Sequence, residues 1–454
     1  MAHLIRIDWP HNGIPDTPAA LSLTELRARL TATRAAAKKR GYQSLVIYGD
    51  REHAANLHWL TGFDPRFEEA VLILTQSDAL LLAGNECLAY TAISPLVAAE
   101  DIRTGLCSSL SLPSQPRSGR RLKEWLAEMV PTGPIGVVGW KWYSAAEVDD
   151  PATALDVPAF LADPLRALSK RVENATDLLQ HPTHGLRARV DADDIARLEF
   201  SNHMAATALR RIAFALKDGM TDFAAYEAGR IGGLPLGCHS TFASGTTPGL
   251  SGPIGQTLHK GQPVSFNVCH WGSNICRAGW LAHGPADLPK SAQDYLDSFV
   301  VPYVQAMSHW CGLMHPGLHG GVIWRHIQQD LPFDTFGVTL NPGHLIGLDE
   351  WMSSPIYEKS TEPLASGMAM QMDVIPSHPD YGSTRMEDGY VIADEELRED
   401  LARRFPNVAL RCAARARFMR DVIGMDVPET LLPLADTCGI VAPWLFDPSH
   451  VVAL

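Results

Sequence analysis

The chain has 454 residues, of which 46% are hydrophobic and 20% are charged, and its formal net charge is -13. A chain of this length is too long to fold around a single hydrophobic core, so two domains are expected. The acidic excess argues against a nucleic-acid partner, because proteins that bind phosphate backbones concentrate Lys and Arg. No apolar run approaches the ~20 residues of a membrane span, and the N-terminus lacks the apolar core of a secretory signal. Eight scattered cysteines without a close Cys-x-x-Cys pair are typical of reduced thiols, which favours a cytoplasmic location.

The first 170 or so residues alternate between helical and strand patterns. Residues 21–40 begin with a Ser/Thr cap signal, repeat apolar side chains at helical spacing and end before Gly41, which predicts a helix. A second helix is expected near 119–129, and short apolar runs bounded by turn residues predict strands at 44–49, 70–74, 79–84 and 133–139. This alternation predicts an α/β domain.

The pattern changes at residues 171–190, which are polar, contain Pro and Gly and show no sustained period. The domain boundary is placed here, giving an N-terminal domain of 1–175 and a second domain of 176–454. Residues 191–221 then begin a long amphipathic helix with an Asp-rich start and a stop at Gly219. Further on, SFNVCHWGSNICRAGW (265–280) predicts two short strands joined by a Gly-Ser-Asn turn, the pattern of a β-hairpin.

Five segments, in order along the chain, resemble landmarks of the creatinase and prolidase family. They are YGDREHAANLHWLTGF (48–63), KDGMTDFAAYEA (217–228), NPGHLIGLDEW (341–351), GMAMQMDVIP (367–376) and TRMEDGYVI (384–392). The resemblance covers nearly the whole chain. It implies an N-terminal creatinase-type α/β domain followed by a C-terminal pita-bread domain, the α/β fold of methionine aminopeptidases, aminopeptidase P, prolidase and creatinase.

The resemblance also identifies five positions at which the family's metallopeptidases hold two metal ions. Where those enzymes have Asp, Asp, His, Glu and Glu, this chain has Asn267, Ala278, His344, Asp373 and Glu387. Two neighbouring divalent ions need bridging carboxylates, whereas Asn offers one neutral oxygen and Ala offers none. No metal cofactor is therefore expected, and the alternative is a single divalent ion held by the histidine and the two remaining carboxylates.

Creatinase is the member of this family that hydrolyses a C–N bond without metal. The resemblance implies that its hairpin also carries Asn and Ala at these two positions. The match then breaks. The family's catalytic histidine should fall in the glycine-rich loop 244–255, which has none; Ser251 is the nearest candidate, and His239 and His259 flank the loop. The glutamate that creatinase carries shortly after the alanine is also missing. The resemblance therefore does not carry creatine over as the substrate.

Cys269 and Cys276 share strand faces with Asn267 and Ala278, because every second residue of a strand points the same way. Two thiols and His344 could bind a soft metal, or one thiolate could be a nucleophile with His344 as its base. The other interpretation is that both are small buried hydrophobes that fill space. Their spacing matches no standard zinc motif, which favours packing.

The predicted catalytic residues are His344, Asp373 and Glu387. Buried carboxylates are costly unless they are paired or used, and strand alternation puts Arg385 on the same face as Glu387. A working acid–base pair is predicted there, with an inert Arg–carboxylate network as the alternative. The predicted substrate-binding residues are Asn267, Arg385, Ser251, Trp351, Phe63 and Arg66.

Phe63 and Arg66 belong to GFDPRFEEA (62–70), which resembles the creatinase segment that reaches into the partner subunit's active site. A plain surface loop is the alternative. The resemblance implies a homodimer acting on a small molecule. The expected function is a creatinase-like hydrolase that cleaves a C–N bond of a small nitrogenous compound. The alternatives are an Xaa-Pro aminopeptidase or prolidase with a reduced metal site, and a catalytically inactive binding protein.

Overall fold

The computed structural model describes residues 2–247 and 249–454, and these fall into two compact units. One unit is Ala19–Ala188; the other combines the residues up to Pro18 with Arg189–Leu454. The sequence-based division at residue 175 assigns the N-terminal segment to the first domain, whereas that segment belongs to the second compact unit. Among the described residues, no helix is both long and apolar enough to cross a membrane.

The unit Ala19–Ala188 is built on one mixed six-stranded sheet in the order β5-β4-β3-β2-β6-β7. Pairing is parallel for β2–β6, β6–β7 and β4–β5, and antiparallel for β2–β3 and β3–β4. The strands are β2 (Ser44–Gly49), β3 (Ala70–Thr75), β4 (Ala79–Ala83), β5 (Arg103–Leu106), β6 (Ile135–Val138) and β7 (Val172–Asn174).

Both faces of the central part of this sheet are buried, which explains why β2, β3, β4 and β6 are largely apolar. Leu45 and Ile47 of β2 pack in one apolar cluster, and Val46 and Tyr48 pack in another on the opposite face. The helices are α1 (Leu23–Lys39), α2 (Ala55–Thr61), α3 (Cys87–Tyr90), α4 (Pro95–Ala98), α5 (Leu122–Met129), α6 (Ala159–Leu168) and α7 (Asp177–Gln180). The first cluster includes side chains of α1, α2 and α7, and the second includes side chains of α5 and α6.

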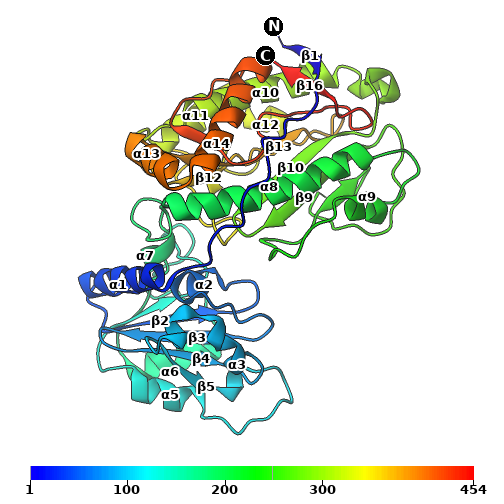
Figure 1. The fold of residues 1–454 in the computed structure, drawn as a ribbon. Coiled ribbons are helices and arrows are strands. Elements are labelled where there is room, and N and C mark those ends of the chain that lie inside the picture. Colours follow the sequence, from blue (N-terminus) through cyan, green and yellow to red (C-terminus); the bar gives the residue numbers. More distant parts are fainter. Residues whose placement is uncertain (1, 248) are drawn as a thin grey trace. The chain divides into compact units, whose positions relative to one another are not determined.

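The second unit contains two four-stranded sheets, ordered β13-β10-β9-β8 and β11-β12-β14-β15. The first consists of β8 (Phe242–Ser244), β9 (Pro263–His270), β10 (Ser273–Trp280) and β13 (Arg385–Glu387), all antiparallel. The second consists of β11 (His344–Leu345), β12 (Ala369–Gln371), β14 (Gly389–Ile392) and β15 (Leu431–Pro433). Figure 1 shows α8 running across β9 and β10.

The helices of this unit are α8 (Ala192–Ala215), α9 (Asp222–Ala228), α10 (Val301–Gly312), α11 (Gly320–Asp330), α12 (Phe333–Phe336), α13 (Glu395–Arg404) and α14 (Pro406–Phe418). The helix predicted over 191–221 ends at Ala215, because the following backbone pairs with residues 256–258 instead. Gly219 N donates to Leu258 O at 2.9 Å, and Asp222 N donates to Gln256 O at 2.9 Å.

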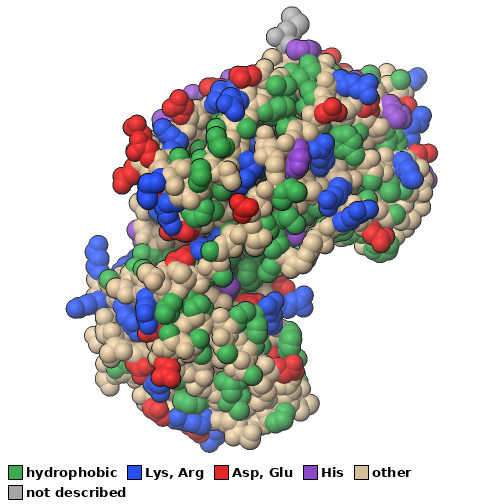
Figure 2. All heavy atoms as spheres, in the orientation of Figure 1, with side chains coloured by type: hydrophobic (Ala, Val, Ile, Leu, Met, Phe, Trp, Pro, Cys, Tyr) green, Lys and Arg blue, Asp and Glu red, His purple; other side chains and the backbone are tan. Residues whose placement is uncertain are grey.

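The two ends of the chain meet in a small sheet. Strand β1 (His3–Arg6) pairs antiparallel with β16 (His450–Ala453), and the indole N–H of Trp9 donates to Pro448 O at 2.8 Å. These contacts join the N-terminal segment to the second unit. Charged side chains of both signs, with hydrophobic ones between them, cover the face drawn in Figure 2.

Candidate active site

The hairpin β9–β10 turns at Trp271 and Gly272, so its turn starts one residue before the Gly-Ser-Asn turn that the sequence suggests and is one residue shorter. Gly272 has a φ of 82°, in the left-handed region, and a Cβ there would lie 2.5 Å from Leu198 Cδ2. Both facts favour glycine at this position. Ser273 and Asn274 therefore belong to β10, and the prediction of the turn was wrong.

The short turn sets which residues lie side by side. Asn267 is opposite Cys276, and Cys276 is beside Glu387 of β13. Ala278 lies in the next row, between Ser265 and Arg385. Asn267 and Ala278 are thus in different rows, and a cysteine stands between Asn267 and the glutamate. Because residues two apart share a face, both rows face the same side of the sheet.

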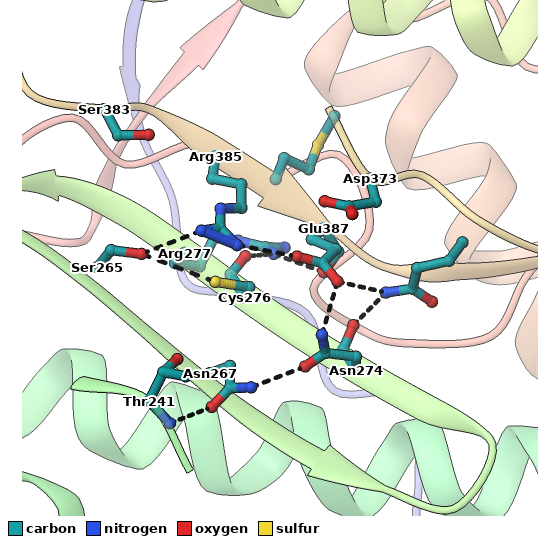
Figure 3. Close-up of polar contacts among 12 residues, drawn as sticks. Thr241, Ser265, Asn267, Asn274, Cys276, Arg277, Asp373, Ser383, Arg385 and Glu387 are labelled. Carbon is teal, nitrogen blue, oxygen red and sulfur yellow. Dashed lines mark hydrogen bonds and ion pairs between the residues drawn. The ribbon is translucent and has the colours of Figure 1, made fainter. Parts of the chain in front are cut away.

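A chain of side-chain amides crosses this face (Figure 3). The backbone N–H of Thr241 donates to Asn267 Oδ1 at 2.8 Å, and Asn267 Nδ2 donates to Asn274 Oδ1 at 3.1 Å. Asn274 Nδ2 donates in turn to Glu387 Oε1 at 2.8 Å, and Gln371 Nε2 lies 3.4 Å from the same oxygen. The polar atoms of Asn267 are thus committed to protein partners, which gives this residue a positioning role.

The carboxyl group of Glu387 has a strongly displaced pKa. Its carboxyl is buried, and Oε2 lies 3.2 Å from Arg385 Nη1. Burial raises its pKa well above the usual range, the charge of Asp373 adds to the rise, and Arg385 only partly opposes it. Burial likewise raises the pKa of Cys276 to about 12, so this thiol stays protonated. The environment of Glu387 therefore favours the protonated form of its carboxyl group.

His344 has one ring nitrogen engaged and one available. Nδ1 lies 3.1 Å from Leu345 O, and a carbonyl can only accept, so Nδ1 carries a proton. Nε2 is buried and has no hydrogen-bond partner among the described residues. It lies 3.5 Å from Glu350 Oε1 and 3.8 Å from Asp373 Oδ2. The ring stacks on Trp351 with centroids 4.1 Å apart. This packing fixes the plane of the imidazole.

Asp373 follows β12 rather than lying within it, because that strand ends at Gln371. The residue is 5% exposed, and its Oδ1 has no hydrogen-bond partner among the described residues. The structure therefore brings the three predicted catalytic residues together through shared neighbours, with Asp373 beside His344 and close enough to act on the pKa of Glu387.

A pair of thiols lies beside the amide chain. Asn267 Nδ2 lies 3.6 Å from Cys238 Sγ, and Cys269 donates a hydrogen bond to the same sulfur. The bond from Cys269 lowers the pKa of Cys238, whereas Cys269 itself has a raised pKa. Cys238 is half-buried and Cys269 is buried. The more reactive thiol of this face is therefore one that the sequence did not single out.

The other predicted substrate-binding residues lie in different surroundings. Ser251 is half-buried in the loop before the hairpin, where its carbonyl accepts from Phe242 N. In the unit Ala19–Ala188, Phe63 is fully buried in the apolar core, with its ring 5.6 Å from that of Tyr90. Arg66 is exposed and donates to Tyr90 Oη. Phe63 is thus a core residue of its own unit, while Arg66 is accessible.

Sequence reasoning missed four residues of this face: Asn274, Gln371, Glu350 and Cys238. Asn274 was assigned to the turn, and its position in β10 follows only from the two-residue hairpin. Gln371 precedes the predicted Asp373 by two positions, so strand alternation could have included it. For Cys238 the sequence carries no signal, because it lies in a long loop.

No protein-family model matches the sequence, and no curated protein matches it. Solved structures do. The prolidase from Pyrococcus horikoshii OT3 is 13% identical with a TM-score of 0.62, covering 81% of this chain and 95% of its own. The Xaa-Pro dipeptidase from Bacillus anthracis is 14% identical with a TM-score of 0.60, covering 82% and 96%. Dipeptidase PepE from Mycobacterium ulcerans is 19% identical with a TM-score of 0.60, covering 83% and 95%.

These likenesses show the fold. The chain has the two-domain pita-bread architecture of prolidases, Xaa-Pro dipeptidases and X-Pro aminopeptidases, as the sequence predicts. The N-terminal domain of SPT16, a subunit of the FACT complex, from Cicer arietinum matches equally well, at 13% identity and a TM-score of 0.59 over 82% of this chain. A fold alone does not define an activity, so function has to be argued from the site.

The residues present do not fit a dinuclear metal centre. The Asn267 amide is hydrogen-bonded on both sides, Ala278 offers no donor, and the neighbouring Cys276 thiol stays protonated. The Arg385 guanidinium already provides a positive charge beside Glu387. Within the described ranges, no group of three His, Cys, Asp or Glu side chains is arranged to hold a metal ion.

Proposed function

We propose that this protein is a hydrolase that cleaves a C–N bond of a small nitrogenous compound with its own side chains. The observation that carries the proposal is the pairing of two groups on one face of the pita-bread unit. One is the unpartnered Nε2 of His344, and the other is the buried, proton-holding carboxyl of Glu387. An amine-releasing hydrolysis needs one group of each kind.

In this proposal His344 is the general base. Its Nδ1–H is held by Leu345 O, which leaves the Nε2 lone pair to take a proton from water. The carboxylates of Glu350 and Asp373, at 3.5 and 3.8 Å, stabilise the imidazolium that forms. The resulting hydroxide adds to the carbon of the scissile bond. Trp351 keeps the ring in place by stacking.

Glu387 is the general acid. Its raised pKa favours the protonated form, and it donates that proton to the leaving nitrogen as the C–N bond breaks. The hydrogen bond from Asn274 and the contact with Arg385 orient the carboxyl and support the carboxylate that remains. The proton that His344 took from water then returns to Glu387 through solvent. One water is consumed for each bond cleaved.

The substrate-binding part of the proposal rests on two features. Arg385 Nε is buried without a hydrogen-bond partner among the described residues, so a substrate carboxylate or carbonyl can accept from it. Ala278, the partner of Arg385 in the same row, has no polar side-chain atom that could engage the guanidinium. Ser251 and Trp351 remain further contacts in this proposal, as does Arg66 from a homodimer partner.

The solved structures of this fold favour a second candidate, an Xaa-Pro dipeptidase or aminopeptidase. A third is a binding protein without activity, since one matching structure is a subunit of a complex. One experiment separates the three: protein purified without chelator is assayed on creatine-like, cyclic-amidine and proline-containing compounds, with and without EDTA. The proposal predicts hydrolysis that EDTA leaves unchanged. Activity lost with EDTA and restored by Mn²⁺ or Zn²⁺ supports the peptidase and contradicts the proposal.

Variants make the assay specific for the site. His344→Ala and Glu387→Gln should each lower kcat about 100-fold or more, the usual scale for loss of a general acid or base. The matched controls are His259→Ala and Glu396→Gln, which change exposed side chains of the same types. If no compound is hydrolysed but one binds, and His344→Ala does not alter its affinity, the binding-protein candidate replaces the enzyme.

A further inference from the structure

A cavity lies in the second unit, between the N-terminal segment and α8. Its volume is about 500 Å³, within the range of small-molecule pockets. Its walls come from residues 9–14, α8, the loop at 230–232 and residues 436–437, and none of the candidate active-site residues lines it. It is therefore a separate feature from the site described above.

The rim of this cavity is positively charged, although the chain as a whole carries a net charge of -13. Arg210, Arg211 and Arg230 line it. Arg210 is partly engaged, with Nη1 3.5 Å from Pro10 O and its guanidinium over the Phe214 ring. The guanidinium groups of Arg211 and Arg230 are exposed and take part in no hydrogen bond or ion pair with the described residues. Two cations are thus available to a ligand.

The one carboxylate among the lining residues does not cancel this charge. Asp436 Oδ1 accepts from Arg415 Nε at 2.7 Å and from Asn12 Nδ2 at 2.9 Å. Because Arg415 is buried next to Asp436, the opposite charges of the two side chains largely cancel at the cavity wall. Figure 2 shows blue side chains and a purple histidine gathered beside hydrophobic ones over the C-terminal half of α8.

The floor contains an unsatisfied polar group and the walls contain aromatic rings. His203 is 3% exposed, and its Nδ1 has no hydrogen-bond partner among the described residues. Nε2 lies 3.4 Å from Thr207 Oγ1, while Nδ1 is 3.9 Å from Asp436 Oδ2, beyond hydrogen-bond distance. Trp9 and Phe214 pack edge to face with centroids 5.4 Å apart. A buried, unpaired nitrogen beside aromatic walls is a feature that a bound molecule would complete.

We infer that this cavity binds a small organic anion with a flat apolar body. Its anionic group lies against Arg211 and Arg230, its body packs on Trp9 and Phe214, and one polar atom reaches His203 Nδ1. Guanidinium groups pair with carboxylate or phosphate in two-pronged geometry, which suits the exposed rim. The inference does not depend on the proposed hydrolase activity, because the two sites share no residue.

The test uses phenyl phosphate as the probe, titrated into the full chain and followed by isothermal calorimetry. The expected result is saturable binding of one molecule per chain, weakened by added NaCl because the arginines are exposed. The double variant Arg211→Ala/Arg230→Ala should weaken binding at least tenfold. Arg325→Ala, an exposed arginine of α11, is the matched control and should leave binding unchanged. His203→Phe tests the floor and should also weaken binding.

Several outcomes would overturn the inference. They are no binding at millimolar phenyl phosphate, equal binding by the double arginine variant, or equal binding of uncharged benzyl alcohol. Inorganic phosphate is titrated alongside, and affinity equal to that of phenyl phosphate would contradict the role of the aromatic walls. All variants change surface or cavity side chains, and circular dichroism and thermal melting establish that each is folded before it is titrated.

Discussion

Glu387 should make the stability of its unit depend on pH. Burial raises the pKa of this carboxyl above its ordinary value of 4.5, so the folded state keeps a proton that the unfolded state releases. The stabilising contribution is therefore complete below about pH 4.5 and is lost as pH rises toward the folded pKa, at about 1.4 kcal/mol per pH unit. Glu387→Gln cannot release a proton and should not show this loss.

Urea unfolding at several pH values between 4 and 8 measures the difference between wild type and Glu387→Gln. We expect the free energy of unfolding of the wild type to fall relative to the variant as pH rises. The free energy of unfolding of Glu396→Gln, a change at an exposed position, should depend on pH in the same way as that of the wild type. A wild type that gains stability relative to Glu387→Gln over this range would show that Arg385 lowers the pKa more than burial raises it.

Cys238 should be the first cysteine to react with iodoacetamide. It is half-buried, while the other cysteines are buried, and the hydrogen bond from Cys269 lowers its pKa. Thiolate is the reactive form, so the rate follows both accessibility and pKa. Peptide mass spectrometry after short exposure should find the label at Cys238, and Cys269→Ala should slow labelling several-fold. Labelling that starts at another cysteine would contradict this environment.

At the scale of elements, the hairpin shows what the sequence could and could not predict. The hairpin pattern of 265–280 predicts both strands, and the shared face of Asn267 and Cys269 follows from strand periodicity. The register of the two strands could not be predicted, because it depends on the length of the turn, and Gly272 is compatible with both a two-residue and a three-residue turn. The family resemblance identifies His344, Asp373 and Glu387. The position of Asn274 on the same face could be predicted only from the register of the hairpin.

Helices α8 and α14 are joined by a buried ionic network that should dominate the stability of their interface. Glu199 is fully buried and accepts from Arg411 Nε at 2.7 Å and from Arg411 Nη2 at 2.8 Å, and its Oε1 forms an ion pair with Arg415 Nη2 at 2.8 Å. Removing one partner of a buried pair leaves uncompensated charge, which costs about 3–5 kcal/mol. Glu199→Gln should therefore lower the free energy of unfolding by that order.

Asp400→Asn is the matched control for Glu199→Gln. Asp400 pairs with Arg403 and Arg404 on the surface of α13, where ion pairs contribute about 0–1 kcal/mol. Urea unfolding of both variants and the wild type gives the comparison. A Glu199→Gln variant no less stable than Asp400→Asn would mean that α8 and α14 are held by apolar contacts, such as those of Ile195 and Cys412, rather than by charge.

At the scale of the whole molecule, the N-terminal segment was the part the sequence could not place. HLIR at 3–6 is too short to indicate a strand, and its partner at 450–453 lies at the far end of the chain. Local patterns carry no information on such pairing, since it depends on contacts that form only in the folded unit. The α/β pattern of 44–138 could be predicted locally, because each of its strands is an apolar run bounded by turn residues, even though β2 pairs with the distant β6.

Deleting residues 2–18 should therefore destabilise the unit that contains β16 while leaving Ala19–Ala188 unaffected. The deletion removes the strand partner of His450–Ala453 and the buried indole of Trp9, whose loss alone costs about 3–5 kcal/mol. Differential scanning calorimetry should show the transition of the second unit at lower temperature. The transition that matches an isolated 19–188 fragment, with its own two apolar clusters, should not move. Trp9→Ala should give part of the same shift, because it keeps the β1–β16 pairing. If the deletion shifts the 19–188 transition instead, the N-terminal segment supports the first unit, and the division of the chain has to be redrawn.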